Sequence, residues 1–221
     1  PFSFYFLNEV DGPSGLHFPS GFRYTLKPSF TMIHNFKQGY WMGEGNVHMS
    51  YYHLKHALFE DRSRVVPAMI FELGHNRFYN KLYTGSSLSY RRSRYVDQSD
   101  IPLFDTSDRP AVAEFQSSSS RFIGEDRISD ENDLIGSFQA QKILSNNQSW
   151  KVLLQQRYAL KLHKVCLGAS CAEDHNAYKH ISPFITNISK HYHSWHLISN
   201  TKWNWSKSRV DRALLRLGYQ I

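Results

Sequence analysis

The sequence lacks any run of apolar residues long enough for a transmembrane helix, which needs roughly 18 or more in succession. A mean hydropathy of −0.51 and a hydrophobic share of 41% argue against a membrane protein built from several helices. Enzyme motifs are also lacking: there is no G-x-S-x-G, no H-E-x-x-H, no Walker A sequence and no G-x-G-x-x-G between a strand and a helix. We therefore expect neither a helical membrane protein nor an enzyme.

Cysteine is scarce, with only Cys166 and Cys171, five positions apart in a segment of small residues. This spacing can close a small disulfide in an oxidising compartment such as the periplasm, and two free thiols are the alternative. His163 and His175 flank the pair, but the four residues do not make an established zinc pattern. We expect no metal and no cofactor.

The charge balance is basic, with a formal net charge of +7 and a pI near 9.4. Such a balance suits nucleic acid, anionic lipid, or an inner surface that handles phosphorylated ligands. The basic residues are dispersed along strand-like segments and do not form blocks, which argues against a nucleic-acid partner.

Aromatic residues are abundant, at 15%, and they recur in short alternating runs that favour strands. The clearest run extends from Phe22 to Ile33, where every second side chain is apolar and the residues between are mostly polar. Because successive side chains of a strand point to opposite faces, one face suits lipid or a core and the other suits water. Pro28 removes a hydrogen-bond donor, so we expect a local distortion there.

Similar patterns predict roughly ten strands in all. The other candidates are 2–7, 41–54, 65–73, 82–91, 134–141, 150–162, 181–192, 195–205 and 212–221. Long and short connections alternate, as in a membrane barrel with long extracellular loops and tight periplasmic turns. The predicted fold is all-β, an antiparallel transmembrane β-barrel of which this chain supplies about ten strands. A soluble β-sandwich with an aromatic core is the alternative.

One connection, from about 92 to 132, is too long to be an ordinary loop. A flexible Ser117–Ser120 run lies between two clusters that mix both charge signs. We expect ion pairs among these charges to fold the loop onto or into the barrel, whereas a solvated charged loop is the alternative. No domain boundary is evident, so residues 1–221 are interpreted as part of a single barrel domain.

The first cluster reads DQSDIPLFDT over residues 97–106, and the second reads RFIGEDRISD over residues 121–130. Together they resemble the DQ-x-x-(I/L)-P-x-FDT and RF-x-G-x-DR-x-x-D signatures in the barrel domain of the lipopolysaccharide-assembly family LptD. The matching residues are Asp97, Gln98, Pro102, Phe104, Asp105, Thr106, Arg121, Phe122, Gly124, Asp126, Arg127 and Asp130. Weaker likeness at 21–28, 64–67 and 182–205 extends the resemblance over most of the chain.

The resemblance implies a large barrel in the cell outer membrane that takes lipopolysaccharide from a periplasmic bridge and releases it into the outer leaflet. An LptE-like lipoprotein would plug the barrel, and an LptA-like bridge would dock on a domain that is not recognisable here. The chain starts at Pro1 without a leader pattern, so we expect a fragment. Neither the N-terminal jellyroll nor the gate strands that the resemblance implies are recognisable, so we expect an interior portion of such a barrel. Cys166 and Cys171 do not match the adjacent cysteine pair of that family.

Basic residues recur at the alternating strand positions that would face the lumen of the barrel. They would form a cationic inner wall for a phosphorylated glycolipid. These candidate luminal residues are Arg23, Lys27, Lys151, Arg157, Lys161, Lys202, Arg212 and Arg216. Alternatives are a general porin or ligand-gated receptor, whose lumen would also be polar, and an outer-membrane hydrolase that uses His191 or Ser194.

Overall fold

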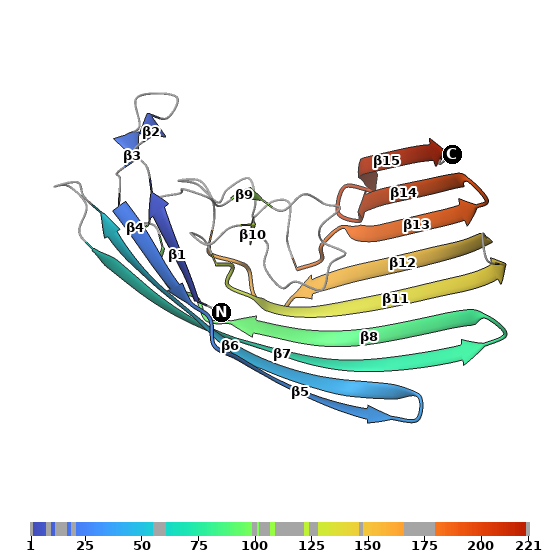
Figure 1. Ribbon diagram of the computed structural model, residues 1–221, viewed down its shortest axis with the longest axis horizontal. Helices are drawn as coiled ribbons and strands as arrows, with labels where there is room; N and C mark the ends of the chain where they lie inside the picture. Colours follow the sequence, from blue (N-terminus) through green and yellow to red (C-terminus); the bar gives the residue numbers. More distant parts are fainter. Residues whose placement is uncertain are drawn as a thin grey trace.

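The computed structural model is built from β-strands, which confirms the predicted all-β class (Figure 1). It describes residues 2–7, 10–11, 17–18, 21–54, 61–98, 101, 107–108, 122–123, 128–145, 148–165 and 180–219, with side chains for 21–53, 61–98, 101, 128–144, 148–165 and 180–219. In this part of the chain, no helix has the length and apolar character needed to cross a membrane.

One antiparallel sheet holds most of the strands, in the order β1–β4–β6–β7–β8–β11–β12–β13–β14–β15, and β5 pairs with β6 beside β4. Their bounds are Phe2–Leu7 (β1), Gly21–Leu26 (β4), Ser29–Phe36 (β5), Gly39–Leu54 (β6), Arg62–Tyr79 (β7), Leu82–Ser93 (β8), Asn132–Ser145 (β11), Gln148–Ala159 (β12), Phe184–Tyr192 (β13), Trp195–Asn204 (β14) and Arg209–Tyr219 (β15). Two short pairs lie outside this sheet: β2 (Val10–Asp11) with β3 (His17–Phe18), and β9 (Ser107–Asp108) with β10 (Phe122–Ile123).

β4 and β5 are the two halves of the predicted strand at 22–33, interrupted at Pro28. Both halves pair with the long strand β6, β4 with its end and β5 with its beginning. The Val47 N–H of β6 bridges the interruption by donating to the Pro28 carbonyl at 3.1 Å. The expected distortion is therefore confirmed, and its cause is the missing N–H of proline.

The connections alternate between the two ends of the sheet. The strand pairs β5–β6, β7–β8, β11–β12 and β13–β14 are joined at one end of the sheet, here called the tight-turn rim. The pairs β1–β4, β6–β7, β8–β11, β12–β13 and β14–β15 are connected at the other end, the long-connection rim. At Asn80 and Lys81 both φ angles are positive, as a two-residue type I′ hairpin requires. The hairpins of β5–β6 and β7–β8 are longer and their turns shorter than predicted, whereas the alternation itself is confirmed.

The two faces of the sheet differ in polarity along every long strand. Tyr24, Leu26, Phe30, Phe71 and Leu215 are exposed, with 38–72% of their surface accessible. Such exposure of large apolar side chains excludes a soluble sandwich that buries them. The residues between them on each strand form the opposite, mainly polar face.

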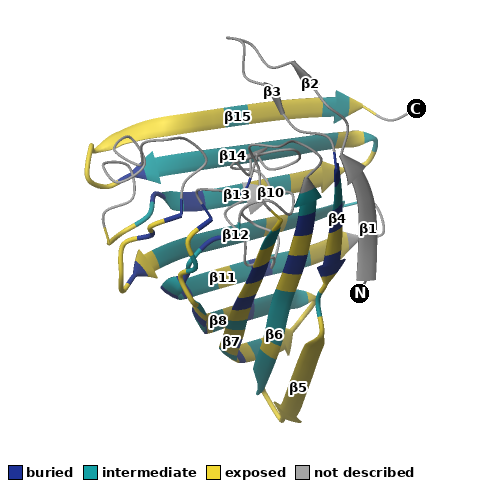
Figure 2. Cartoon of the chain, turned by 90° about the vertical axis from the view of Figure 1, so that its left-hand side faces the viewer, coloured by how far each residue is buried: buried dark blue, intermediate teal, exposed yellow. Residues whose placement is uncertain are grey.

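The sheet curls into a trough, and its two edge strands are β1 and β15 (Figure 1). No ladder joins these two edge strands in the described residues, so the sheet is open, as expected of part of a barrel. Burial follows the strand alternation and is greatest toward the long-connection rim (Figure 2). The buried apolar residues include Tyr52, Val66 and Ile135 of the sheet and Ile101 and Val165 of the connections.

Candidate functional site

The polar face of the sheet is buried near the long-connection rim although it carries charged side chains. Arg23, Arg64 and Arg91 stand on β4, β7 and β8 and are at most 6% exposed. Burying a guanidinium without hydrogen-bonding partners is costly, so this face needs a polar cover. At Arg64, Gln98 of the long connection provides part of this cover.

Gln98 connects the first of these segments to the sheet and to the second segment. Its Oε1 accepts a hydrogen bond from Arg64 Nη1 at 2.6 Å and another from the Ile128 N–H at 2.9 Å. Its Nε2 donates to the Ile128 carbonyl at 2.9 Å and to the Val96 carbonyl at 3.3 Å. Arg64 also donates to Ser50 Oγ at 2.9 Å. One buried amide thus ties the beginning and the end of the long connection to β7.

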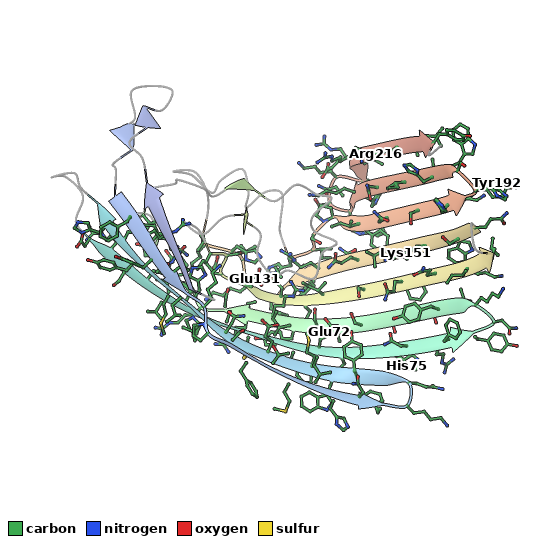
Figure 3. All side chains as sticks on the ribbon, viewed as in Figure 1. Glu72, His75, Glu131, Lys151, Tyr192 and Arg216 are labelled. Carbon is green, nitrogen blue, oxygen red and sulfur yellow. The ribbon has the colours of Figure 1, made fainter. Side chains whose placement is uncertain are left out.

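The two ends of the long connection also meet at Ser93, the last residue of β8. The Ser93 Oγ donates to the Ser129 carbonyl at 2.5 Å and accepts from the Glu131 N–H at 2.7 Å. The Ser93 N–H donates to the Glu131 carbonyl at 2.8 Å. Figure 3 shows Glu131 inside the curve of the sheet, where the connection returns to β11. We call the cluster of Arg64, Ser93, Gln98, Ile128 and Glu131 the loop anchor.

Asp130 fixes the segment that follows β12. Its carboxylate accepts the backbone N–H of Lys164, at 2.9 and 3.0 Å, and that of Val165 at 3.0 Å. The His163 Nδ1 is hydrogen-bonded to the Asp130 carbonyl. These bonds explain why β12 ends at Ala159 and does not continue to Leu162 as predicted: the chain turns inward to meet Asp130.

A buried acid lies beneath this contact. Asp133 is fully buried, with one carboxylate oxygen 3.5 Å from His163 Nε2 and the other 3.8 Å from Arg157 Nε. The sheet register also places Arg91 of β8 directly opposite it. Asp133 therefore adds an acid to the buried basic side chains of this wall, where Glu131 and Glu72 also lie near Arg91.

Below the loop anchor the concave face is lined by hydroxyl and amide groups. Ser87 and Ser137 are hydrogen-bonded across β8 and β11 at 2.8 Å, and the Tyr83 hydroxyl contacts Asn76 and Gln139 at 2.9 and 3.1 Å. These residues line a shallow groove of about 230 Å³. Such a wall can exchange hydrogen bonds with water or with a hydroxyl-rich ligand.

The structure places only part of the predicted motif residues. Gln98 and Asp130 lie at the contacts described above, Asp97 precedes Gln98, and Phe122 pairs with Asp108 between β10 and β9. Outside the described residues are Pro102, Phe104, Asp105, Thr106, Arg121, Gly124, Asp126 and Arg127, together with Cys166 and Cys171. Their predicted roles, including the disulfide, stay predictions.

The predicted basic residues are spread over the concave face. Arg23, Arg157, Lys151 and Lys202 share the register of the polar face, and β15 adds Arg212 and Arg216 opposite Lys202 and Ile198 (Figure 3). Lys27 follows β4 and is half-buried, whereas Lys161 lies beyond the end of β12, at the long-connection rim. The described residues contain no group of three His, Cys, Asp or Glu side chains that could hold a metal ion.

Sequence reasoning did not identify Arg64, Ser93 or His163 as partners of the motif residues. For Arg64 there was one indication in the sequence, because its position in the alternating pattern places it on the polar face. Ser93 and His163 carried none, because their partners lie more than thirty positions away, as shown by their bonds to Ser129 and Asp130.

Comparisons with known proteins support the sequence resemblance. The comparison with curated proteins found no match. The family model described as LptD, LPS transport system D, matches residues 3–221, which is nearly the whole chain and includes both motif clusters and the loop anchor. The chain belongs to the LptD family.

Proposed function

We propose that this chain forms part of the wall of an outer-membrane barrel through which lipopolysaccharide reaches the outer leaflet. Membership of the LptD family links the chain to lipopolysaccharide transport at the outer membrane. The observation that carries the more specific proposal is the division of one curved sheet into an apolar outward face and a polar, basic concave face. A passage for an amphiphile needs both surfaces.

The concave face suits the head group of lipopolysaccharide. Its lower part presents hydroxyl and amide groups such as those of Tyr83, Ser87 and Ser137, which can exchange hydrogen bonds with sugars. Arg212 and Arg216 of β15 are exposed on the same face and can pair with phosphate. The outward face, with Phe71 and Leu215, suits the acyl chains of surrounding lipid.

The loop anchor would close part of the extracellular end of this passage. Long connections of outer-membrane barrels lie on the extracellular side, and in this chain they share the rim where Gln98 and Arg64 meet. A head group that leaves the barrel would pass the anchored connection. The open edges at β1 and β15 would pair with further strands, since unpaired backbone groups are not tolerated in lipid.

Further partners follow from the same proposal. An LptE-like lipoprotein would occupy the concave space as a plug, and an LptA-like periplasmic bridge would deliver lipopolysaccharide through a separate domain. A basic and polar concave face is compatible with both a lipid head group and a protein plug.

Depletion of the complete protein in cells tests the transport function. We expect newly made lipopolysaccharide to stop reaching the cell surface, as measured by surface labelling, and plasmid-borne wild-type protein to restore it. Unchanged surface labelling during depletion would reject the proposal. Ion conduction by the purified protein without a lipoprotein partner, combined with normal labelling, would favour a general porin.

If the outward face lies in the membrane, arginine substitutions at two neighbouring positions of β13 should differ strongly in their effect on stability. Ile188 lies on the outward face and Ser189 on the concave face, opposite Lys151. Ile188→Arg is expected to destabilise the complete barrel by about 2–4 kcal/mol, because it places a charge in hydrocarbon near the middle of a strand. The matched Ser189→Arg is expected to cost less than about 1 kcal/mol, since its side chain reaches water. Urea unfolding in lipid vesicles measures both, and equal losses would contradict the assignment.

A further inference from the structure

A second cavity lies at the long-connection rim, where β8 and β11 leave the sheet. It measures about 680 Å³ and is lined by residues 67–69 inside β7, 92–95 at the end of β8, 130–132 at the start of β11, and Lys161, Leu162 and Lys164. We call it the rim cavity and define it by Met69, Arg92, Arg94, Tyr95, Lys161 and Leu162. It is separate from the groove on the concave face, which lies nearer the tight-turn rim.

The rim cavity borders the apolar outward face of the sheet. Met69 of β7 and Arg92 of β8 are paired across the two strands, and both positions belong to the outward face of the sheet. Met69 is followed on the same face by Phe71 and Leu73, all three about half exposed. At about 3.4 Å per residue this apolar track extends roughly 14 Å along β7 from the cavity toward the tight-turn rim.

Basic side chains also line the cavity. Arg92, Arg94 and Lys161 are exposed, and within the described residues none of them is paired with a carboxylate. A fourth cation, Lys164, lies over the ring of Tyr95 at 5.3 Å.

Two acids, Asp130 and Glu131, also line the cavity. The Asp130 carboxylate accepts the backbone N–H groups of Lys164 and Val165 and is held by them. Glu131 is buried at the base of the long connection. The lining thus contains four cations and two acids, and its net charge is positive.

We propose that the rim cavity binds a phosphorylated lipid of the outer leaflet from outside the barrel. Its phosphate would lie among Arg92, Arg94 and Lys161, and its acyl chains would follow Met69, Phe71 and Leu73. Charge complementarity selects the phosphate, and the adjoining apolar track selects a lipid over a free anion. The inference rests on the proposed function, because that proposal places the outward face in lipid and this rim at the outer leaflet.

Site-specific crosslinking on the complete protein tests this site separately from transport. A photoreactive benzophenone side chain at Met69 is expected to crosslink lipid A, whereas the same group at Met32, on the outward face of β5 away from the cavity, reports lipid that is merely nearby. We expect the triple variant Arg92→Gln, Arg94→Gln, Lys161→Gln to lower the Met69 crosslink about tenfold or more. The crosslink at Met32 is expected to stay unchanged.

A matched triple variant removes the same charge at the opposite rim. Lys37→Gln, Arg77→Gln, Lys81→Gln changes three exposed cations near the tight turns and is expected to leave the Met69 crosslink unchanged. Equal crosslinking by lipid A from which the phosphates have been removed would overturn the proposal, as would full retention in the first triple variant. Displacement by inorganic phosphate at concentrations similar to those of lipid A would also overturn it, because the site would then be a free-anion site.

Surface labelling of the same strains separates this site from the transport function. Normal surface lipopolysaccharide with a lost Met69 crosslink supports the rim cavity. Unchanged surface labelling during depletion of the protein would reject transport, whatever the crosslink shows.

Discussion

Replacing Gln98 with leucine is expected to detach the long connection from the sheet. The substitution removes an acceptor from the buried Arg64 guanidinium and both partners from the backbone of Ile128. Each buried polar group left without its partner costs about 1–3 kcal/mol. Leucine has a similar volume but cannot replace any of these bonds. The combined loss is therefore expected to exceed that of any single surface substitution in this chain.

Limited proteolysis of the complete protein in detergent measures this detachment. Trypsin sites at Arg121 and Arg127 lie within the connection, and cleavage that requires opening follows the population of the open form. We expect cleavage of Gln98→Leu at least about tenfold faster than that of the wild type. Gln98→Glu keeps the acceptors for Arg64 and Ile128 and is expected to be intermediate.

A control substitution tests whether the effect is local. Gln141→Leu makes the same change on the concave face of β11, away from the loop anchor, and is expected to leave cleavage within about twofold of the wild type. Equal cleavage of Gln98→Leu and wild type would show that Gln98 does not hold the connection. In cells, loss of surface lipopolysaccharide with Gln98→Leu alone would connect the anchor to transport.

Removing the buried Asp133 is expected to weaken the sheet itself. Without this carboxylate, Arg157 and His163 lose their ion-pair partner and Arg91 lies opposite an apolar side chain. Deleting one member of a buried charge cluster costs about 3–5 kcal/mol, because the remaining charges stay out of water without compensation. We expect a loss of this size for Asp133→Ala, measured as the urea-unfolding free energy of the complete protein.

Two comparisons make the Asp133 prediction specific. Asp211→Ala removes an acid of β15 that accepts hydrogen bonds from the exposed Arg209 at 3.1 Å and from Asn204 at 2.7 Å, and we expect a smaller loss of about 1 kcal/mol. Adding Arg157→Ala to Asp133→Ala is expected to recover part of the lost stability, since one uncompensated charge disappears. Similar losses for Asp133→Ala and Asp211→Ala would show that burial of the cluster does not govern its energy.

Much of the strand architecture could be predicted from local pattern. The alternation of Phe22, Tyr24 and Leu26 with Arg23 and Thr25 identified both faces of β4, and the same parity was followed correctly in β14 and β15. The interruption at Pro28 was predictable because proline lacks an N–H. Turn lengths were less predictable: tight hairpins at 37–38 and 80–81 replaced the loops expected there, since Asn80 and Lys81 accept positive φ without a glycine.

The candidate site was only partly visible in the sequence. The motif clusters located Gln98 and Asp130, but their partners Arg64, Ser93 and His163 stand on other segments, far away along the chain. The rim cavity had no sequence signal at all, because it arises where β7, β8, β11 and residues 161–164 meet. Lys161 changed from a predicted luminal residue to a rim residue once β12 was found to end at Ala159.

The sequence by itself determined the all-β class, the polarity of the two faces and the family, because strand alternation and motif spacing are properties of neighbouring residues. Only the tertiary structure decided how the long connection is anchored, which charges compensate one another and where cavities open. Those features depend on hydrogen bonds and ion pairs between segments that the fold brings together, such as Gln98 with Arg64 and Asp133 with His163.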